Sequence, residues 1–352
     1  MRQNSFLLYG AYGYTGELIA RYARLYNLLP ILAGRREAAL ATLAKKLNLS
    51  YKVIDLDNTP ALLAALKEVK VVVHAAGPFQ FTAKQMVEAC LQTGTHYLDI
   101  NGDIAVFEML KKYDAVASRS GIMLMPGAGF DVVPTDCTAM WLKKLMPDAV
   151  ALQLAFATLG GGLSHGTATT IVNKLGEGGA VRKNGKIIRQ SLGKNGMWVD
   201  FGKKKLFVMT IPWGDLSTAY FSTGIPNIET YMAISINSYR MLKIQPLFNW
   251  LLRTNFIRRY IKKKINSQPA GPSDEQRQKS ISLVWGQVTN AEGKTASVRM
   301  SGPEGYTLTM HSALLITKKV LEGNLRIGYQ TPATAYGEDL VLEIPDVNRE
   351  TI

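Results

Sequence analysis

A glycine-rich turn near the start of the chain constrains the fold more than any other feature of the sequence. An apolar run, Phe6–Tyr9, leads into the turn, and a helical pattern of apolar residues follows it from Thr15. The spacing G-x-x-G-x-x-G at this place is a variant of the turn with which nucleotide-binding domains approach a pyrophosphate. The following helix would offer N–H groups and a partial positive charge to the same group. We predict that the pyrophosphate is held by Gly10, Ala11, Tyr12, Gly13, Tyr14, Thr15 and Gly16, the alternative being a tight turn whose glycines serve packing only.

Short apolar runs alternate with helical patterns throughout the first 133 residues. The strand-like runs are Phe6–Tyr9, Pro30–Ala33, Tyr51–Ile54, Val69–Ala75, Tyr97–Ile100 and Ile122–Met125. The runs are mainly apolar rather than alternating, as expected for strands of a parallel sheet that is covered on both faces. This order predicts a Rossmann-type, doubly wound α/β domain over residues 1–133.

The pattern changes beyond Pro134. Longer β-type runs follow a helix there, separated by glycine clusters and basic turns, and they include Ala149–Thr158, Ser282–Thr289 and Tyr306–Met310. We predict a second domain of the α+β class with a largely antiparallel sheet over residues 134–327.

The end of the second predicted strand bears on the choice of coenzyme. An acidic residue at this place would hold a ribose 2′-hydroxyl, whereas arginine accommodates a 2′-phosphate. Gly34 is followed by Arg35 and Arg36, with no acid before Glu37. Because guanidinium groups bind phosphate in a bidentate manner, the sequence favours NADP, as NADPH, over NAD. The alternative is that both arginines open the next helix on a solvated face.

Two further loops follow strands of the same predicted sheet. Asp55 and Leu56 come after the third strand, where a side chain can reach the adenine edge of the cofactor. Small residues after the fourth strand leave room for the cofactor, and the predicted contacts there are Ala76, Gly77, Pro78 and Phe79. His74 lies inside the apolar fourth strand, and we expect it to be a hydrogen-bonded core residue.

Several motifs together resemble the saccharopine dehydrogenase-like oxidoreductases, in the branch that contains bacterial trans-acting enoyl reductases and lipid-droplet proteins. They are GAYGYTG at 10–16, AGRR at 33–36, AAGPF at 75–79, YLDINGD at 97–103, PGAGFDVVPTD at 126–136, PWGDLSTAYFSTGIPNIETY at 212–231 and GYQTPATAYGEDLVLEI at 328–344. The resemblance implies an N-terminal Rossmann domain that binds NADP and a second domain inserted before the C-terminus. It also implies that residues 328–352 return to the first domain, and that the loop at 76–79 lies near the nicotinamide ribose.

The candidates for proton chemistry come from two loops. Asp131 follows the sixth predicted strand at the ligand-binding edge of the sheet, although it or Thr135 could instead cap the next helix. His165 and Lys174 accompany a glycine cluster in the second domain and could donate a proton, the alternative being a capped loop with Ser164 or Thr167 as the cap. Four scattered histidines and two distant cysteines provide no metal-ligand spacing, so we expect no metal site.

The charge of the chain lies mainly in its second half. Forty-one Lys and Arg residues against 27 Asp and Glu give a net charge of +14. Residues 245–265 read as a basic helix with two apolar stripes, which suits an anionic membrane or lipid surface, a protein layer or a homodimer interface. No nucleic-acid motif accompanies the charge. The start of the chain lacks a signal-peptide pattern, so we expect a cytoplasmic protein that can lie peripherally at the inner face of the membrane.

These observations favour an NADP-dependent oxidoreductase that acts on a lipid-like or acyl substrate. Enoyl reduction is what the resemblance implies, whereas the coenzyme follows from the residues. One alternative is a nucleotide-binding protein of lipid surfaces that has no turnover. Another is a saccharopine-type amino-acid dehydrogenase, which would need a carboxylate-binding arginine cluster that the second-half motifs do not locate.

Overall fold

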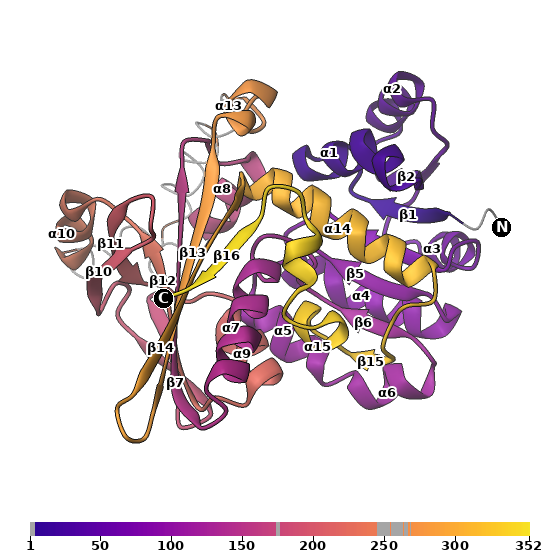
Figure 1. The fold of residues 1–352 in the computed structure, drawn as a ribbon. Coiled ribbons are helices and arrows are strands. Elements are labelled where there is room, and N and C mark those ends of the chain that lie inside the picture. Colours follow the sequence, from indigo (N-terminus) through magenta and orange to yellow (C-terminus); the bar gives the residue numbers. More distant parts are fainter. Residues whose placement is uncertain (1–3, 174–176, 245–253, 255–262, 264–266, 268) are drawn as a thin grey trace. The chain divides into compact units, whose positions relative to one another are not determined.

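The computed structural model describes residues 4–173, 177–244, 254, 263, 267 and 269–352 (Figure 1). The chain forms two compact units. The first comprises Met1–Val133 and Tyr306–Ile344, and the second comprises Pro134–Gly305 and Pro345–Ile352. The predicted basic helix at 245–265 lies outside the described residues, apart from Thr254 and Lys263.

The first unit is built on a parallel sheet whose strands follow the order β15-β6-β5-β4-β1-β2-β3. The strands are β1 (Ser5–Tyr9), β2 (Leu29–Gly34), β3 (Tyr51–Val53), β4 (Val71–His74), β5 (His96–Asp99), β6 (Met123–Met125) and β15 (Gly328–Tyr329). All four side chains of β4 are buried, as the continuous apolar runs predict. Since β1 pairs with both β2 and β4, the strand order reverses beside it, where sheets of this type bind nucleotides.

Helices connect the parallel strands of the first unit and flank the sheet (Figure 1). They are α1 (Tyr14–Tyr22), η1 (Ala23–Tyr26), α2 (Glu37–Leu47), α3 (Thr59–Leu66), α4 (Phe79–Thr93), α5 (Ile104–Lys111), α6 (Asp114–Arg119), α14 (Gly305–Leu321), α15 (Pro332–Tyr336) and η3 (Leu340–Glu343). Their ends follow local rules of sequence. Asn58 and Asp103 accept backbone N–H bonds at the starts of α3 and α5, and Gly94 ends α4 with φ +69°.

Helix α14 corrects one prediction from the sequence. Residues 306–310 were expected to form a strand because Tyr306, Leu308 and Met310 alternate with polar residues, but this expectation is wrong. The apolar pattern continues for several more turns, and a 17-residue helix buries Leu314, Ile316 and Val320 with it. The helix belongs to the first unit, where Tyr306 makes an edge-to-face ring contact with Tyr14.

The second unit is built on a mixed, largely antiparallel sheet that also contains one parallel pair, β12 with β7. Its strands are β7 (Ala149–Leu159), β8 (Gly179–Lys183), β9 (Lys186–Gln190), β10 (Gly196–Asp200), β11 (Lys205–Thr210), β12 (Asn227–Ala233), β13 (Ile281–Asn290), β14 (Thr295–Pro303) and β16 (Asn348–Thr351). Its helices are α7 (Val133–Leu145), α8 (His165–Asn173), α9 (Asp215–Thr223), α10 (Ile236–Ile244) and α13 (Asp274–Gln278). Val208, Leu283 and Trp285 belong to its buried core. The predicted fold class, a Rossmann sheet plus a largely antiparallel α+β part, is confirmed.

The C-terminal part of the chain divides between the two units. Residues 306–327, which the sequence interpretation assigned to the second domain, lie in the first unit through α14. Residues 328–344 also lie in the first unit, because β15 pairs in parallel with β6. The last residues do not follow them, since β16 pairs antiparallel with β14 in the second unit.

Candidate nucleotide-binding site

The glycine-rich turn after β1 is shaped by the backbone of two other segments. Gly10 has φ +86°, and its N–H donates to the carbonyl oxygen of Ala33 at 2.8 Å. A Cβ atom at Gly10 would lie only 2.7 Å from the backbone nitrogen of Ala76. A Cβ atom at Gly16 would overlap the carbonyl oxygen of Gly10. Both positions therefore require glycine for the turn itself to fold.

Gly13 has a different role in the same turn. It stands at the N-cap of α1 with φ −73°, a backbone conformation that any residue adopts. A Cβ atom there would meet the carbonyl oxygen of Gly10 at 3.2 Å, a tight contact that a small shift relieves. Glycine at this position leaves the helix N-terminus without a side chain over it, as a pyrophosphate would need.

Arg35 and Arg36 lie exposed at the end of β2. The Arg36 guanidinium carbon is 4.4 Å from the centroid of the Tyr12 ring. The same ring lies against Gly34, where a Cβ atom would come within 2.6 Å of Tyr12 Cε1. In the part of the chain that the structure describes, neither guanidinium takes part in an ion pair. Two exposed cations without a carboxylate partner fit an anionic 2′-phosphate.

Asp55 and Leu56 follow β3 as expected. The Asp55 carboxylate accepts the N–H of Asp57 at 3.2 Å, while the Leu56 side chain is buried. Asp57 in turn accepts the Gln85 amide at 2.9 Å, which joins this turn to α4. The predicted contact of Asp55 with the adenine edge stays a prediction.

The loop after β4 packs against the glycine turn, because the Ala76 backbone lies so close to Gly10 that no Cβ atom would fit between them. The Ala76 carbonyl accepts the Thr82 hydroxyl at 2.9 Å, and the Gly77–Pro78 peptide is cis. Phe79 is the first residue of α4. All the predicted cofactor residues from 10 to 79 thus belong to one unit and to the carboxyl ends of its strands β1 to β4.

The two described candidates for proton chemistry, Asp131 and His165, belong to different units. Asp131 lies half-buried in the turn before α7, in the first unit, and packs against Gly102. His165 is the first residue of α8, in the second unit, and its N–H donates to the Ala270 carbonyl at 3.0 Å. Lys174 lies outside the described residues.

The capping alternatives have different outcomes. Ser164 caps α8, since its hydroxyl oxygen accepts the Thr167 N–H at 3.2 Å, while a role of His165 in proton donation stays a prediction. Thr135 is wrong as a cap, because α7 begins at Val133 and encloses Thr135 in its first turn.

A buried polar cluster at the ends of β4 and β5 escaped the sequence analysis. His74 was expected in the core and is fully buried there, but a chain of hydrogen bonds leads from its ring through Tyr97 to Asp99 and Asn101. Burial lowers the pKa of His74 to about 3 and raises the pKa of Asp99. The available signal was the spacing of Tyr97, Asp99 and Asn101 at every second position, along β5 and just beyond its end.

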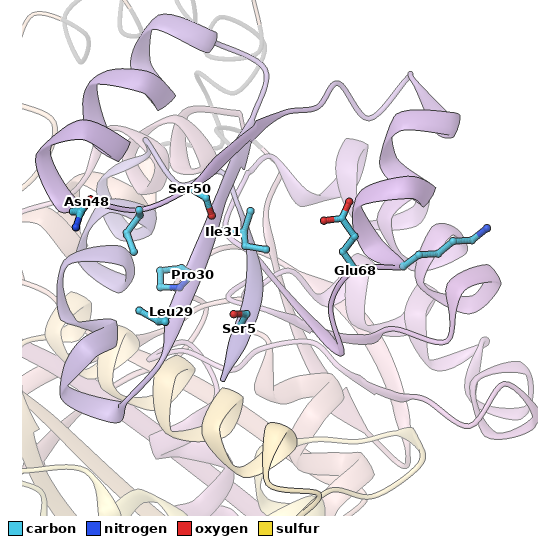
Figure 2. A pocket seen from close by; sticks show the side chains of 9 residues that line it. Ser5, Leu29, Pro30, Ile31, Asn48, Ser50 and Glu68 are labelled. Carbon is cyan, nitrogen blue, oxygen red and sulfur yellow. The ribbon is translucent and has the colours of Figure 1, made fainter. Parts of the chain in front are cut away.

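A hollow of about 570 Å³ opens at the opposite ends of the strands (Figure 2). Figure 2 shows Ser5, Leu29 and Glu68 around it, at the amino ends of β1 and β2 and after α3. The glycine turn lies at the carboxyl ends, so this hollow is separate from the candidate nucleotide site. Among the described residues, no group of three or more His, Cys, Asp or Glu side chains is placed to hold a metal ion. None of the described helices has the length and apolar character to cross a membrane.

Comparison with known protein families matches residues 6–125 to the saccharopine dehydrogenase NADP binding domain. A saccharopine dehydrogenase-like oxidoreductase of Mus musculus is 26% identical over 202 residues, or 50% of this chain and 47% of the relative. A lipid droplet localized protein of Caenorhabditis elegans is 26% identical over 282 residues, or 69% and 66%. A Mycobacterium tuberculosis protein named for trans-acting enoyl reductase activity is 29% identical over 187 residues, or 49% and 45%.

The chain spans about half the length of the first of these relatives. Apo saccharopine dehydrogenase (L-Glu forming) from Saccharomyces cerevisiae shares the fold, with a TM-score of 0.68 and 13% identity over 99% of this chain and 100% of that one. The family match confirms NADP as the cofactor that the end of β2 predicted. The resemblance stated from the motifs is confirmed as well.

Proposed function

We propose, from the premise that residues 6–125 of this chain form a saccharopine dehydrogenase NADP binding domain, that the protein is an NADPH-dependent oxidoreductase. The observation that carries this proposal is the pairing of the open glycine turn with two exposed arginines at the next strand end. The turn would hold the pyrophosphate of NADPH on the N-terminus of α1, and Arg35 and Arg36 would hold its 2′-phosphate. The bound cofactor would supply a hydride.

We propose an acyl or other lipid-like compound as the hydride acceptor, with an enoyl group as the first choice. Two relatives support this choice by their names, one as a trans-acting enoyl reductase and one as a lipid droplet localized protein. Asp131 is the candidate in the first unit for orienting the substrate or a water molecule, because it follows β6 at the carboxyl edge of the sheet. His165 and Lys174 remain candidates for proton donation.

Turnover tests this proposal in two steps. Titration of the purified chain, followed by nicotinamide fluorescence, should give at least about tenfold tighter binding of NADPH than of NADH, the effect of one charged contact. NADPH deuterated at the transferred position should then leave deuterium in the product of a 2-enoyl thioester, as read by mass spectrometry. Equal affinity for both coenzymes would contradict the 2′-phosphate role. Tight NADPH binding without label in any enoyl or carbonyl acceptor would favour the protein without turnover.

A second candidate function, association with an anionic lipid surface, is favoured by a patch in the second unit. We call it the aromatic patch: Trp198, Phe207, Tyr239 and Lys243 on β10, β11 and α10. The rings of Trp198 and Phe207 are 5.7 Å apart, those of Phe207 and Tyr239 are 4.9 Å apart, and Lys243 lies over Tyr239. Trp198 is 55% exposed, more than packing within the unit requires.

The segment that contains Trp198 is rich in basic residues. Residues 182–205 contain eight Lys and Arg residues and a single acid, Asp200, which pairs with Arg299 at 2.7 Å. Exposed aromatic rings next to lysines suit the headgroup region of an anionic membrane or lipid monolayer. The segment at 245–265, for which the sequence predicted the same role, directly follows α10 in the chain and stays a prediction.

Charge removal in the turn of the β10–β11 hairpin, which carries Trp198 and Phe207, should weaken lipid binding. The double change Lys203→Ser and Lys204→Ser should lower co-sedimentation with phosphatidylserine-containing vesicles by roughly thirtyfold in affinity, at about 1 kcal/mol for each charge. Lys45→Ser with Lys46→Ser in α2 removes the same charge from the first unit and serves as the control. Equal sedimentation of both double variants would contradict a lipid-facing role for this patch.

A further inference from the structure

Four polar side chains are buried together beneath the loops of the candidate nucleotide site. His74 ends β4, Tyr97 and Asp99 lie on β5, and Asn101 follows it. The first three are fully buried and Asn101 is 2% exposed. Buried polar groups of this kind are hydrogen-bonded, and the bonds that the structure gives them here are made within the protein.

Asp99 receives donors at both carboxyl oxygens. Oδ1 accepts the Asn101 N–H at 3.0 Å, the Asn101 amide at 2.7 Å and the Gly127 N–H at 2.8 Å. Oδ2 lies 2.7 Å from the Tyr97 hydroxyl and 2.9 Å from the Asn101 amide. Since Oδ1 faces only donors, any proton on Asp99 belongs on Oδ2, toward Tyr97.

His74 is bound on both sides of its ring. Nε2 lies 3.2 Å from the Ala76 carbonyl oxygen, which can only accept, so Nε2 carries a hydrogen. Nδ1 lies 3.3 Å from the Tyr97 hydroxyl. Tyr97 thus stands between His74 and Asp99 with one hydrogen to give.

Counting hydrogens leaves two complete arrangements. If Tyr97 donates to Asp99, Nδ1 of His74 must donate to Tyr97, and the ring becomes a cation opposite a carboxylate. If Tyr97 donates to His74, Oδ2 of Asp99 must carry the proton, and all three groups are neutral. Both arrangements contain one proton more than a neutral imidazole and a free carboxylate.

We propose that Asp99 holds this proton as a neutral carboxylic acid, and that Asp99, Tyr97 and His74 are positioning residues for the nucleotide site. Asp99 accepts a hydrogen bond from the Gly127 N–H, and His74 donates one to the Ala76 carbonyl oxygen. The backbone of Ala76 packs against the glycine turn. The positioning role rests on the proposed function, whereas the protonation of Asp99 does not.

The surroundings of the cluster favour the neutral arrangement. Rings of Tyr9 and Phe79 pack edge-on against His74, at 5.6 Å and 5.3 Å. The titratable neighbours are Tyr9, whose pKa burial raises to about 12, and Cys90, whose thiol pKa burial also raises, so both stay uncharged. Without a nearby countercharge from these neighbours, burial disfavours both the imidazolium and the carboxylate.

Asp99→Asn is the diagnostic variant, because its amide copies the protonated acid at Oδ1, where the oxygen accepts, and toward Tyr97, to which the NH₂ donates. The contact that it loses is the longer one of Oδ2 with the Asn101 amide, at 2.9 Å, while the 2.7 Å bond of that amide to Oδ1 is kept. We expect its Kd for NADPH to stay within about threefold of the natural protein. Tyr97→Phe removes the link to both partners and should raise that Kd about tenfold, the effect of a lost buried hydrogen bond. Tyr113→Phe, which removes a hydroxyl that donates to Glu88 at 3.0 Å, is the matched control and should change nothing.

Two spectroscopic measurements on the full chain keep the proposal testable if Tyr97→Phe does not fold or NADPH does not bind. Nitrogen-15 spectra of labelled histidine should show His74 as a neutral ring with its hydrogen on Nε2, both in the natural protein and in Asp99→Asn. The infrared difference between these two proteins should contain a carboxylic-acid C=O band. A doubly protonated His74, a hydrogen on Nδ1 alone, or an absent acid band would overturn the protonation. A loss of affinity in Asp99→Asn as large as that in Tyr97→Phe would overturn the positioning by a neutral acid.

Discussion

Gly13→Val should leave the protein folded and raise its Kd for NADPH by at least about a hundredfold. A Cβ atom at Gly13 is confined only by the Gly10 carbonyl oxygen at 3.2 Å, and the backbone there suits any residue. The added methyl groups would stand over the N-terminus of α1, where the pyrophosphate is expected to accept hydrogen bonds. Losing two charge-assisted bonds, each of about 1.5–3 kcal/mol, accounts for the size of the effect.

Isothermal titration with NADPH, together with a thermal melt, measures this outcome. Gly162→Val is the matched control, because a Cβ atom at Gly162 meets nothing within 4 Å and the change adds the same side chain elsewhere. Gly10→Val or Gly16→Val would be less informative, since either change should disrupt the turn itself. A Gly13→Val protein that melts normally and binds NADPH as before would remove the glycine turn from the site.

The second large effect is expected from reversing the charge of Arg35. Arg35→Glu should weaken NADPH binding by roughly a hundredfold and leave NADH binding within a few-fold, so that the coenzyme preference inverts. The carboxylate would repel the 2′-phosphate of NADPH and could accept the 2′-hydroxyl of NADH. Because Arg35 is exposed at the end of β2, the fold should tolerate the change.

The ratio of the two dissociation constants is the quantity to measure, since general damage would lower both affinities. Arg119→Glu is the control, because it makes the same change of charge on an exposed residue of α6. This helix lies next to β15, the strand at the opposite edge of the sheet from β2 and β3. The control should leave the ratio unaltered. An unaltered ratio in Arg35→Glu would shift the 2′-phosphate role to Arg36, which lies over the Tyr12 ring.

The sequence predicted the first unit well because its local signals agree with its tertiary structure. Most of the strands are short runs of apolar residues separated by helices of ordinary length, so the periodicity of apolar residues distinguishes strands from helices. The same method failed at α14. Its first five residues alternate in polarity like a strand, and only the longer window to Leu321 shows a buried helix.

The candidate site was predictable where one short segment carries the signal. The glycine turn and the arginines at 35 and 36 are of this kind. The cluster of His74, Tyr97 and Asp99 was not predictable in this way, because its hydrogen bonds join two strands and its protonation depends on full burial. The grouping of Asp131, His165 and Lys174 was likewise beyond the sequence, since each was chosen from its own loop.

The division of the chain has a consequence for anyone who wishes to study one half alone. The backbone passes between the units three times, after Val133, after Gly305 and after Ile344. No single cut therefore releases either half intact. A fragment ending at residue 133 would lack both α14, ten of whose residues are buried, and β15, which otherwise covers the edge of β6. An excised nucleotide-binding half would have to be spliced, with 133 joined to 306, to keep its own core covered.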